Sequence, residues 1–301
     1  MYNIIGTQKI WFGISGFLML LSIIFLAMGG LKLGIDFTGG SFLEVSYSNQ
    51  RPSVEQIQAS LADLGLKSLK IQPSGDSDYI LRFENIEENV HQSIISDLEN
   101  IKIEEIEDNT LTELRFEAVG PIIGEELKSK TIEAIIVVLI FIILYIAYAF
   151  RKVSKPVASW KYGLAAIIAL VHDILIITGL FAALGYFFGT EIDVLFVTAL
   201  LTILGFSVHD TIVTFDRIRE NLFKNQDKSF EDIVNISVNE TIVRSINTSF
   251  TTLLVLLAIY FFGGESIKNF VLALIFGVIV GTYSSIFLAS PLLTIWRKIK
   301  V

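Results

Sequence analysis

Cysteine is absent from the 301 residues, and histidine occurs only three times. The first absence excludes a disulfide framework, a thiolate metal site and a cysteine nucleophile. The second leaves too few ligands for most histidine-rich metal sites, and we expect no metal or cofactor. Charged residues make up 18% of the chain, whereas soluble domains average about 25%. Because 52% of the residues are hydrophobic, a protein that is soluble throughout is not expected.

Several enzyme signatures are also missing. There is no G-x-x-x-x-G-K-[S/T] phosphate-binding loop and no H-E-x-x-H zinc motif, so ATP hydrolysis and zinc-dependent proteolysis are not supported. An intramembrane aspartyl protease could share a proton between Asp173 and Asp210, but no G-x-G-D motif accompanies them. We therefore predict no catalytic residues and no enzymatic activity.

Charge is unevenly distributed along the chain. The net charge is −8, but residues 31–126 contain 7 Lys and Arg against 19 Asp and Glu, which gives −12. The remainder contains 16 against 12, which gives +4. An acidic block is thus set in a hydrophobic, slightly basic frame. Nucleic acid is not expected as a partner, because no basic face balances this block.

Six apolar stretches are long enough to cross a bilayer, which needs roughly 20 residues. The first has too long an apolar run for a signal peptide and no A-x-A cleavage site follows it, so it is interpreted as an uncleaved anchor. The sequence predicts six transmembrane helices. They are expected at 10–30, 134–150, 162–188, 194–215, 246–262 and 270–295.

The basic residues near the span ends predict the orientation. They gather in the 150–161 and 216–245 connections and in the C-terminal tail, which lie on one side if there are six spans. That side is predicted to be cytoplasmic, with both termini, and the acidic block faces outward. The residues are Arg151, Lys152, Lys155, Lys161, Arg217, Arg219, Lys224, Lys228, Arg244, Arg297, Lys298 and Lys300.

The acidic block at 31–126 is predicted to fold as a small α+β domain. A capping box of Ser53 and Gln56 begins one helix, which ends near Gly65, and periodic apolar residues over 86–98 predict a second. The order of strands and helices is typical of a ferredoxin-like split βαβ unit, with one extra hairpin strand. Strands are expected at 43–47, 69–71, 79–83, 101–106 and 111–116, with a turn at 73–76.

No nucleophile, metal cluster or phosphate loop is visible in this domain. Binding or docking is the favoured role, and a folded spacer is the alternative.

Ionisable residues inside membrane spans cost roughly 2.5–3.5 kcal/mol on insertion scales and are functional candidates by default. Two pairs occur here, His172-Asp173 in the third span and His209-Asp210 in the fourth. The first pair is equally well interpreted as a helix-packing contact. Asp210 could be a structural carboxylate bonded to a hydroxyl of a neighbouring helix.

Two stripes of polar residues accompany these pairs and should face protein or water. A carboxylate beside a movable guanidinium is a plausible proton gate, and one proton crossing 100 mV releases about 2.3 kcal/mol. This makes Asp210 and Arg244 the candidate pair, although Arg244 could also simply anchor the topology. The stripes are Ser207, Asp210 or Thr211, and Thr214 in the fourth span, and Arg244, Thr248 and Thr251 in the fifth.

Small residues recur every four positions in the last span, at Gly277, Gly281, Ser285 and Ala289. Such a stripe lets helix backbones approach closely. The pattern predicts tight packing but does not identify the partner helix.

Several longer motifs together resemble the SecD/SecF family of protein-export membrane proteins, in particular its smaller, SecF-type members. The resemblance covers nearly the whole chain, and only six spans are present. The motifs are G-I-D-F-T-G-G at 34–40, V-G-P at 119–121 followed by Gly124, Glu126 and Leu127, G-F-S-V-H-D-T-I-V at 205–213, F-D-R-I-R-E-N at 215–221, R-S-I-N-T-S at 244–249 and G-T-Y-S-S-I-F at 281–287.

The resemblance implies a half unit of the RND superfamily in the cell inner (cytoplasmic) membrane. Such subunits pair with SecD beside the SecYEG channel and use the proton gradient to complete the movement of a preprotein that SecA has pushed. YajC is a further implied partner. The implied domains are the N-terminus with the first helix at 1–30, an extracytoplasmic domain at 31–126 and five helices at 127–301.

The resemblance also implies residue roles. Asp210 matches the proton-carrying aspartate and Arg244 the arginine that gates it, and His209 stands where some relatives carry Asn. Asp36 with Gly39 and Gly40 matches a motif expected to couple the outer domain to the spans. The alternatives are half of a small-molecule exporter, for which 96 outer residues are few, and a purely structural scaffold of the translocon.

Overall fold

The computed structural model describes residues 1–101, 109–149 and 158–298. The chain divides into two compact units. One, the helical unit, comprises Met1–Lys32 and Thr131–Val301, and the other, the α+β unit, comprises Leu33–Lys130.

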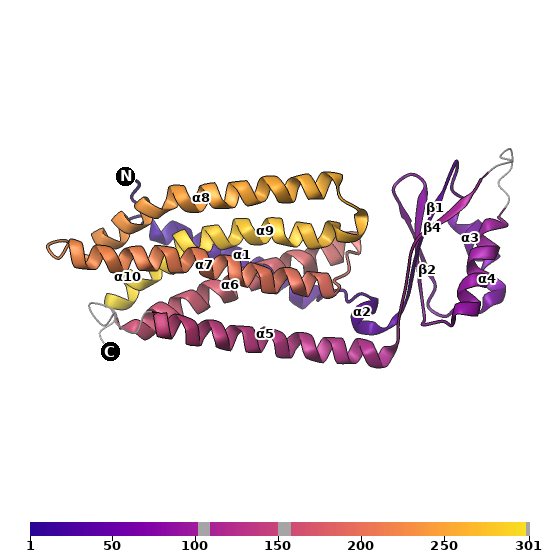
Figure 1. The fold of residues 1–301 in the computed structure, drawn as a ribbon, viewed down its shortest axis with the longest axis horizontal. Helices are drawn as coiled ribbons and strands as arrows, with labels where there is room; N and C mark the ends of the chain where they lie inside the picture. Colours follow the sequence, from indigo (N-terminus) through magenta and orange to yellow (C-terminus); the bar gives the residue numbers. More distant parts are fainter. Residues whose placement is uncertain (102–108, 150–157, 299–301) are drawn as a thin grey trace. The chain divides into compact units, whose positions relative to one another are not determined.

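Long helices dominate the helical unit (Figure 1). Six of the helical segments in the described residues are long and apolar enough to span a membrane, which confirms the predicted number of spans and makes the chain a multi-pass membrane protein. Their bounds are α1 Gln8–Met28, α5 Pro121–Ala149, α6 Ser159–Phe188, α7 Val194–Lys224, α8 Phe230–Phe262 and α9 Lys268–Ser284, which continues through a π-helical segment at Ser285–Ala289 into α10 Ser290–Lys298.

Three of these helices extend well beyond the predicted apolar stretches. α5 begins before residue 134, α7 runs past residue 215, and α8 begins before residue 246. Hydropathy detects only the apolar part of a helix, whereas the backbone continues through polar turns that water can solvate. Caps fix two of the starts, because Asp193 accepts a hydrogen bond from the Phe196 N–H at 2.8 Å and Ser229 accepts one from the Asp232 N–H at 3.2 Å.

Some predicted features lie outside the described residues. They are most of the 101–106 strand, the basic residues Arg151, Lys152 and Lys155, and Lys300 of the tail.

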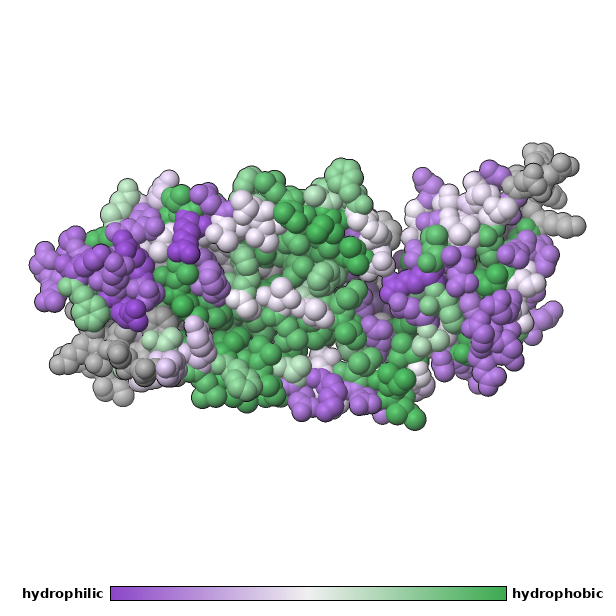
Figure 2. Space-filling view, in the orientation of Figure 1, coloured by the Kyte–Doolittle hydropathy of each residue, from purple (hydrophilic) through white to green (hydrophobic). Residues whose placement is uncertain are grey.

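The interior of the helical unit lies along α6, α7 and α9. About half of the apolar part of each is buried, at 56%, 50% and 50%, against 11%, 6% and 17% for α1, α5 and α8. Figure 2 shows hydrophobic side chains over the middle of the helical unit and hydrophilic ones gathered at the end that holds the α7–α8 connection. An apolar outer surface with polar ends is what a bilayer requires of a membrane-spanning bundle.

The small residues of α9 lie directly against α7. A Cβ placed on Gly277 would overlap the side chain of Ile203, and one placed on Gly281 would lie 3.0 Å from the Cβ of Ser207. The sequence did not identify the helix against which these small residues pack. The structure shows that it is α7 of the same chain.

The α+β unit contains a four-stranded antiparallel sheet of order β2-β3-β1-β4. With the helices after β1 and β3, this order confirms the ferredoxin-like prediction. Apart from the short α2 (Ile35–Thr38) and a 3₁₀ turn at Ala62–Leu64, the elements are β1 Gly40–Tyr47, α3 Val54–Ser60, β2 Lys70–Ser74, β3 Asp78–Phe83, α4 Glu88–Glu99 and β4 Leu111–Val119.

Alternation along the strands positions the core of this unit. Leu43, Val45 and Leu81 are fully buried and pack with Ile57 of α3 and Ile94 of α4. The capping box also forms, because the Ser53 side chain accepts from the Gln56 N–H and the Gln56 side chain accepts from the Ser53 N–H.

One local prediction is wrong in its placement. The turn expected at 73–76 begins only at Gly75, because Pro73 and Ser74 still belong to β2. β2 is an edge strand, where a proline without an N–H removes no necessary ladder bond.

The contact of α9 with α7 gives a prediction for stability. Gly277→Ala should lower the thermal unfolding midpoint of the full chain in detergent, because overpacking typically costs about 1–3 kcal/mol. Gly205→Ala is the matched control, since nothing lies within 4 Å of its Cβ position. Alanine there favours the helix by roughly 0.5–1 kcal/mol. Equal midpoints for the two variants would contradict a close contact at Gly277.

Candidate functional site

Asp210 of α7 is held by one hydroxyl of α8. Its Oδ1 accepts a hydrogen bond from Ser245, whereas its Oδ2 is buried and has no hydrogen-bond partner among the described residues. A buried carboxylate oxygen without a donor is costly as an anion, and protonation removes that cost. The atom is therefore suited to hold a proton.

Arg244 precedes Ser245 on α8, and its side chain lies on the exposed face of that helix. No ion pair joins it to Asp210 in the part of the chain that the structure describes, although its guanidinium acts electrostatically on the carboxyl group. His209 is itself exposed. Asp210 is thus bonded directly to a serine, which is the contact expected if its role is structural. Arg244 is the residue next to that serine in the sequence.

The residues of the predicted stripe on α7 bond to different partners. Ser207 donates to Asp173 rather than lying against Asp210. Thr211 pairs with Ser285 at 2.7 Å, and Thr214 donates to the backbone carbonyl of Asp210 at 3.2 Å.

The predicted stripe on α8 lies on the wrong side of the helix for contact with Asp210. Thr248 and Thr251 are exposed, and each donates back to a carbonyl of its own helix. The buried face instead carries Ser237, Thr241, Ser245 and Ser249. Their spacing of four residues is the sequence signal that could have found this face.

The second ionisable pair lies at the centre of the helical unit. His172 and Asp173 of α6 have no exposed side-chain surface. The Asp173 carboxylate is 2.9 Å from His172 Nδ1 and accepts hydrogen bonds from Ser207 of α7 and Ser284 of α9. Sequence reasoning missed Ser284 and Ser245, both of which bond directly to a buried carboxylate.

A hollow of about 540 Å³ lies between α5, α7 and α8. Arg244 is among the residues that line it, so its guanidinium has room to change position. The other lining residues are Tyr145, Ala149, Ile212, Val213, Asp216, Arg217, Arg219, Glu220, Glu240 and Thr241.

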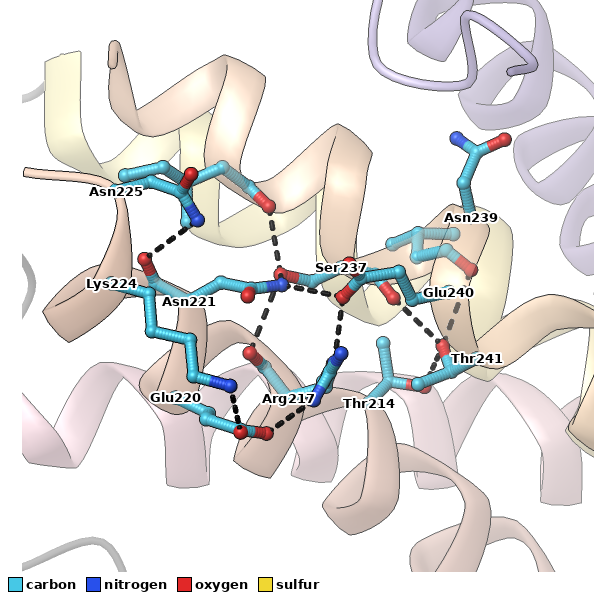
Figure 3. A network of polar contacts seen from close by, with 12 residues as sticks. Thr214, Arg217, Glu220, Asn221, Lys224, Asn225, Ser237, Asn239, Glu240 and Thr241 are labelled. Atoms are coloured by element: carbon cyan, nitrogen blue, oxygen red, sulfur yellow. Dashed lines mark hydrogen bonds and ion pairs between the residues drawn. The ribbon is translucent and has the colours of Figure 1, made fainter. Parts of the chain in front are cut away.

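The charged groups beside this hollow are mostly paired with one another (Figure 3). Arg217 of α7 binds Glu240 of α8 at 2.6 Å and also pairs with Glu220. Asn221 donates to Glu240 at 2.7 Å and to Ser237 at 3.0 Å. The network ties the polar ends of α7 and α8 together, and Arg244 has no ion-pair partner among the described residues.

The double glycine lies at the base of the α+β unit. Gly39 has φ 73° and ψ 164°, a region open essentially to glycine alone. A Cβ there would lie 2.8 Å from the Cα of Pro121, and a Cβ on Gly124 would lie 3.1 Å from the backbone of Phe37. The chain segments that enter and leave the unit thus touch through backbone. Asp36 is half-buried in α2 beside them.

No group of three or more histidine and acidic side chains in the described ranges is arranged to hold a metal ion.

Comparisons with known proteins cover the whole chain. The family model of the protein export membrane protein SecD/SecF C-terminal region matches residues 98–299, and that of the SecD/SecF GG motif matches residues 24–50. Protein translocase subunit SecF of Thermobaculum terrenum is 45% identical over 99% of this chain and 95% of its own length. The SecF subunit of Anaerolinea thermophila is 39% identical over 99% and 95%.

A solved structure is also similar. The crystal structure of SecDF from Thermus thermophilus, described as a translocon-associated membrane protein, has a TM-score of 0.84 and 31% identity over 99% of this chain. This chain spans 39% of the length of that protein.

The glycine contact gives a second prediction. Gly39→Ala should destabilise the α+β unit by clearly more than Gly75→Ala. Both positions have positive φ, but only Gly39 also abuts Pro121, whereas Gly75 has ordinary space around it. A left-handed backbone costs an alanine about 1–2 kcal/mol, and the overlap adds to that. Hydrogen exchange of the β1 and β4 amides in the full chain measures the difference, and equal effects would argue against the contact.

Proposed function

Because the chain belongs to the SecD/SecF family of protein-export membrane proteins, we propose that it is a SecF-type subunit that uses the proton gradient, together with SecD, to complete preprotein translocation across the cytoplasmic membrane. The observation that carries this is the match to curated SecF subunits along nearly the full length of both chains. A role in translocation without catalysis of a chemical reaction is consistent with those names.

In this proposal Asp210 binds the translocated proton and Arg244 gates it. The support is the buried Oδ2 of Asp210, which has no hydrogen-bond partner among the described residues, and the hollow lined by Arg244, which leaves its guanidinium room to move. When Arg244 moves close, it stabilises the carboxylate and favours proton release. When it withdraws into the hollow, the anion loses its counter-charge and takes up a proton.

The partners are proposed on the same basis. SecD is the first proposed partner, because the chain matches curated SecF subunits and is similar to part of a SecDF protein. The apolar and little-buried surfaces of α1, α5 and α8 are available for SecD and for lipid. SecYEG, SecA, YajC and the preprotein are further proposed partners, since the Thermus protein is described as translocon-associated.

We place both termini and the α7–α8 ion-pair network on the cytoplasmic side of the inner membrane, and residues 31–126 on the outer side. The support is the concentration of lysine and arginine in the connections on one side of six spans. The GG motif contact then lies where the outer domain meets its helices, and we propose that Asp36, Gly39 and Gly40 transmit movement there.

The test is export into inverted membrane vesicles carrying Asp210→Asn, with and without a proton gradient. We expect the gradient to accelerate late export with the natural chain and to have no effect with the variant. Asparagine keeps the shape and can accept from Ser245 but cannot exchange a proton.

Asp227→Asn is the matched control, because Asp227 is an exposed carboxylate in the α7–α8 connection, and it should respond to the gradient normally. Co-purification with SecD checks that each variant assembles. An assembled Asp210→Asn variant that still responds fully to the gradient would exclude Asp210 as the coupling group and favour a structural role.

A further inference from the structure

The proposed function does not use the carboxylate of Asp173, which is fully buried in the helical unit. It lies on α6 between α7 and α9, and neither it nor His172 has any exposed side-chain surface. Three helices therefore contribute the polar groups around a single oxygen pair in the interior of a membrane protein. Burying a carboxylate at this depth has a large free-energy cost unless its charge is neutralised.

The groups that face Asp173 supply hydrogen bonds rather than positive charge. Ser207 donates from α7 at 2.6 Å and Ser284 from α9 at 2.8 Å, both to Oδ2. On α6 itself, His172 Nδ1 lies 2.9 Å from Oδ1. No lysine or arginine forms an ion pair with Asp173 in the described ranges.

Tyr283 is the other titratable group at this place. Its ring stacks on that of His172 with centroids 6.2 Å apart. Its hydroxyl donates to the Trp11 carbonyl of α1 at 2.8 Å and lies 3.1 Å from Ser15 Oγ. The hydroxyl of Tyr283 therefore bonds to α1 and not to Asp173. Among the described residues, His172 is the sole titratable side chain in contact with Asp173.

The hydrogen bonds accommodate a protonated Asp173 as well as its anion. Ser284 Oγ has a second acceptor within reach, the Gly281 carbonyl at 3.1 Å. If Oδ2 carries a proton, it donates to Ser284 Oγ, and Ser284 in turn donates to Gly281. When the proton leaves, the Ser284 hydroxyl turns back and donates to Oδ2. Both states use the same heavy-atom positions.

The surroundings of His172 make its imidazole a poor site for the same proton. His172 Nε2 is buried and has no hydrogen-bond partner among the described residues. A neutral ring with its hydrogen on Nδ1 can donate to Asp173 Oδ1 and leaves only a lone pair at Nε2. An imidazolium would leave a buried N–H without an acceptor, which costs roughly 1–3 kcal/mol or more.

The π-helical segment supplies an independent observation at the same place. It begins at Ser285, directly after Ser284, and π-bulges occur frequently at functional sites. Two consecutive serines are both fully buried here, Ser284 against Asp173 and Ser285 against Thr211.

We infer that Asp173 is a second proton-binding carboxylate of this chain, and that Ser284 is the hydroxyl whose reorientation accompanies proton uptake and release. The inference rests on the proposed proton-coupled function only for its use in transport. The protonation itself is a separate property with its own measurement.

Infrared difference spectroscopy of the full chain in lipid vesicles, taken across pH, tests this through the carbonyl stretch of protonated carboxylic acids. We expect Asp173→Asn to lose one such band that Asp210→Asn and the exposed control Asp227→Asn retain. Retention of every band in a folded Asp173→Asn variant would overturn the inference.

Ser284→Ala keeps the test decisive if Asp173→Asn fails to fold. Loss of the acceptor hydroxyl should shift the frequency of the Asp173 band. Ser249→Ala is the matched control, because Ser249 is also a buried serine but pairs with Thr282 at 2.5 Å. An unshifted band in Ser284→Ala would overturn the role of Ser284.

The two proposals fail separately. If the Asp173 band is found but Asp210→Asn still exports with a full response to the gradient, the proposed function fails and the second proton site remains. If Asp210→Asn loses the response and no band depends on Asp173, only the second site is overturned.

Discussion

Every polar side chain in the interior of the helical unit must find its partner within the protein, because a bilayer supplies no water. Serine and threonine meet this demand well, since one hydroxyl can donate to a carbonyl of its own helix and accept from a neighbour. Thr282 does both, donating to the Val278 carbonyl at 2.8 Å while pairing with Ser249. Hydroxyl pairs join α8 to α9 and α7 to the π-helical segment.

The same requirement explains why the carboxylates of Asp173 and Asp210 have different surroundings. Asp173 is surrounded by hydroxyls from two other helices and one imidazole. Asp210 has a single hydroxyl and a guanidinium that stands outside the helix interface. In our proposals the first environment accepts either protonation state of Asp173, and the protonation of Asp210 depends on whether the Arg244 guanidinium approaches.

The periodicity of apolar and polar residues in the sequence was sufficient to predict the helices and strands. It was not sufficient to predict which side chains contact one another. Alternation at Leu43 and Val45 and the capping box at Ser53 predicted the α+β unit, because those patterns reflect local burial. On α8 the sequence indicated the polar stripe of Arg244, whereas the residue that bonds to Asp210 is Ser245. A sequence pattern shows that a stripe is polar, but which stripe faces α7 depends on how the helices pack. The same limit applied to Gly277, whose spacing indicated close packing while only the structure identified Ile203 as the contact.

The contact of Gly39 with Pro121 affects how the folding free energy depends on the length of the α+β unit. Gly40 also pairs with Val119 across β1 and β4. These two contacts close the α+β unit into a loop at the point where the chain enters and leaves it, which we call the neck. The entropy of closing a loop rises only with the logarithm of its length, by about 0.6 kcal/mol for each doubling. Residues added far from the neck therefore change the folding free energy little and leave the two membrane helices in place. Evolution can enlarge or replace such an insert without redesigning the helical unit.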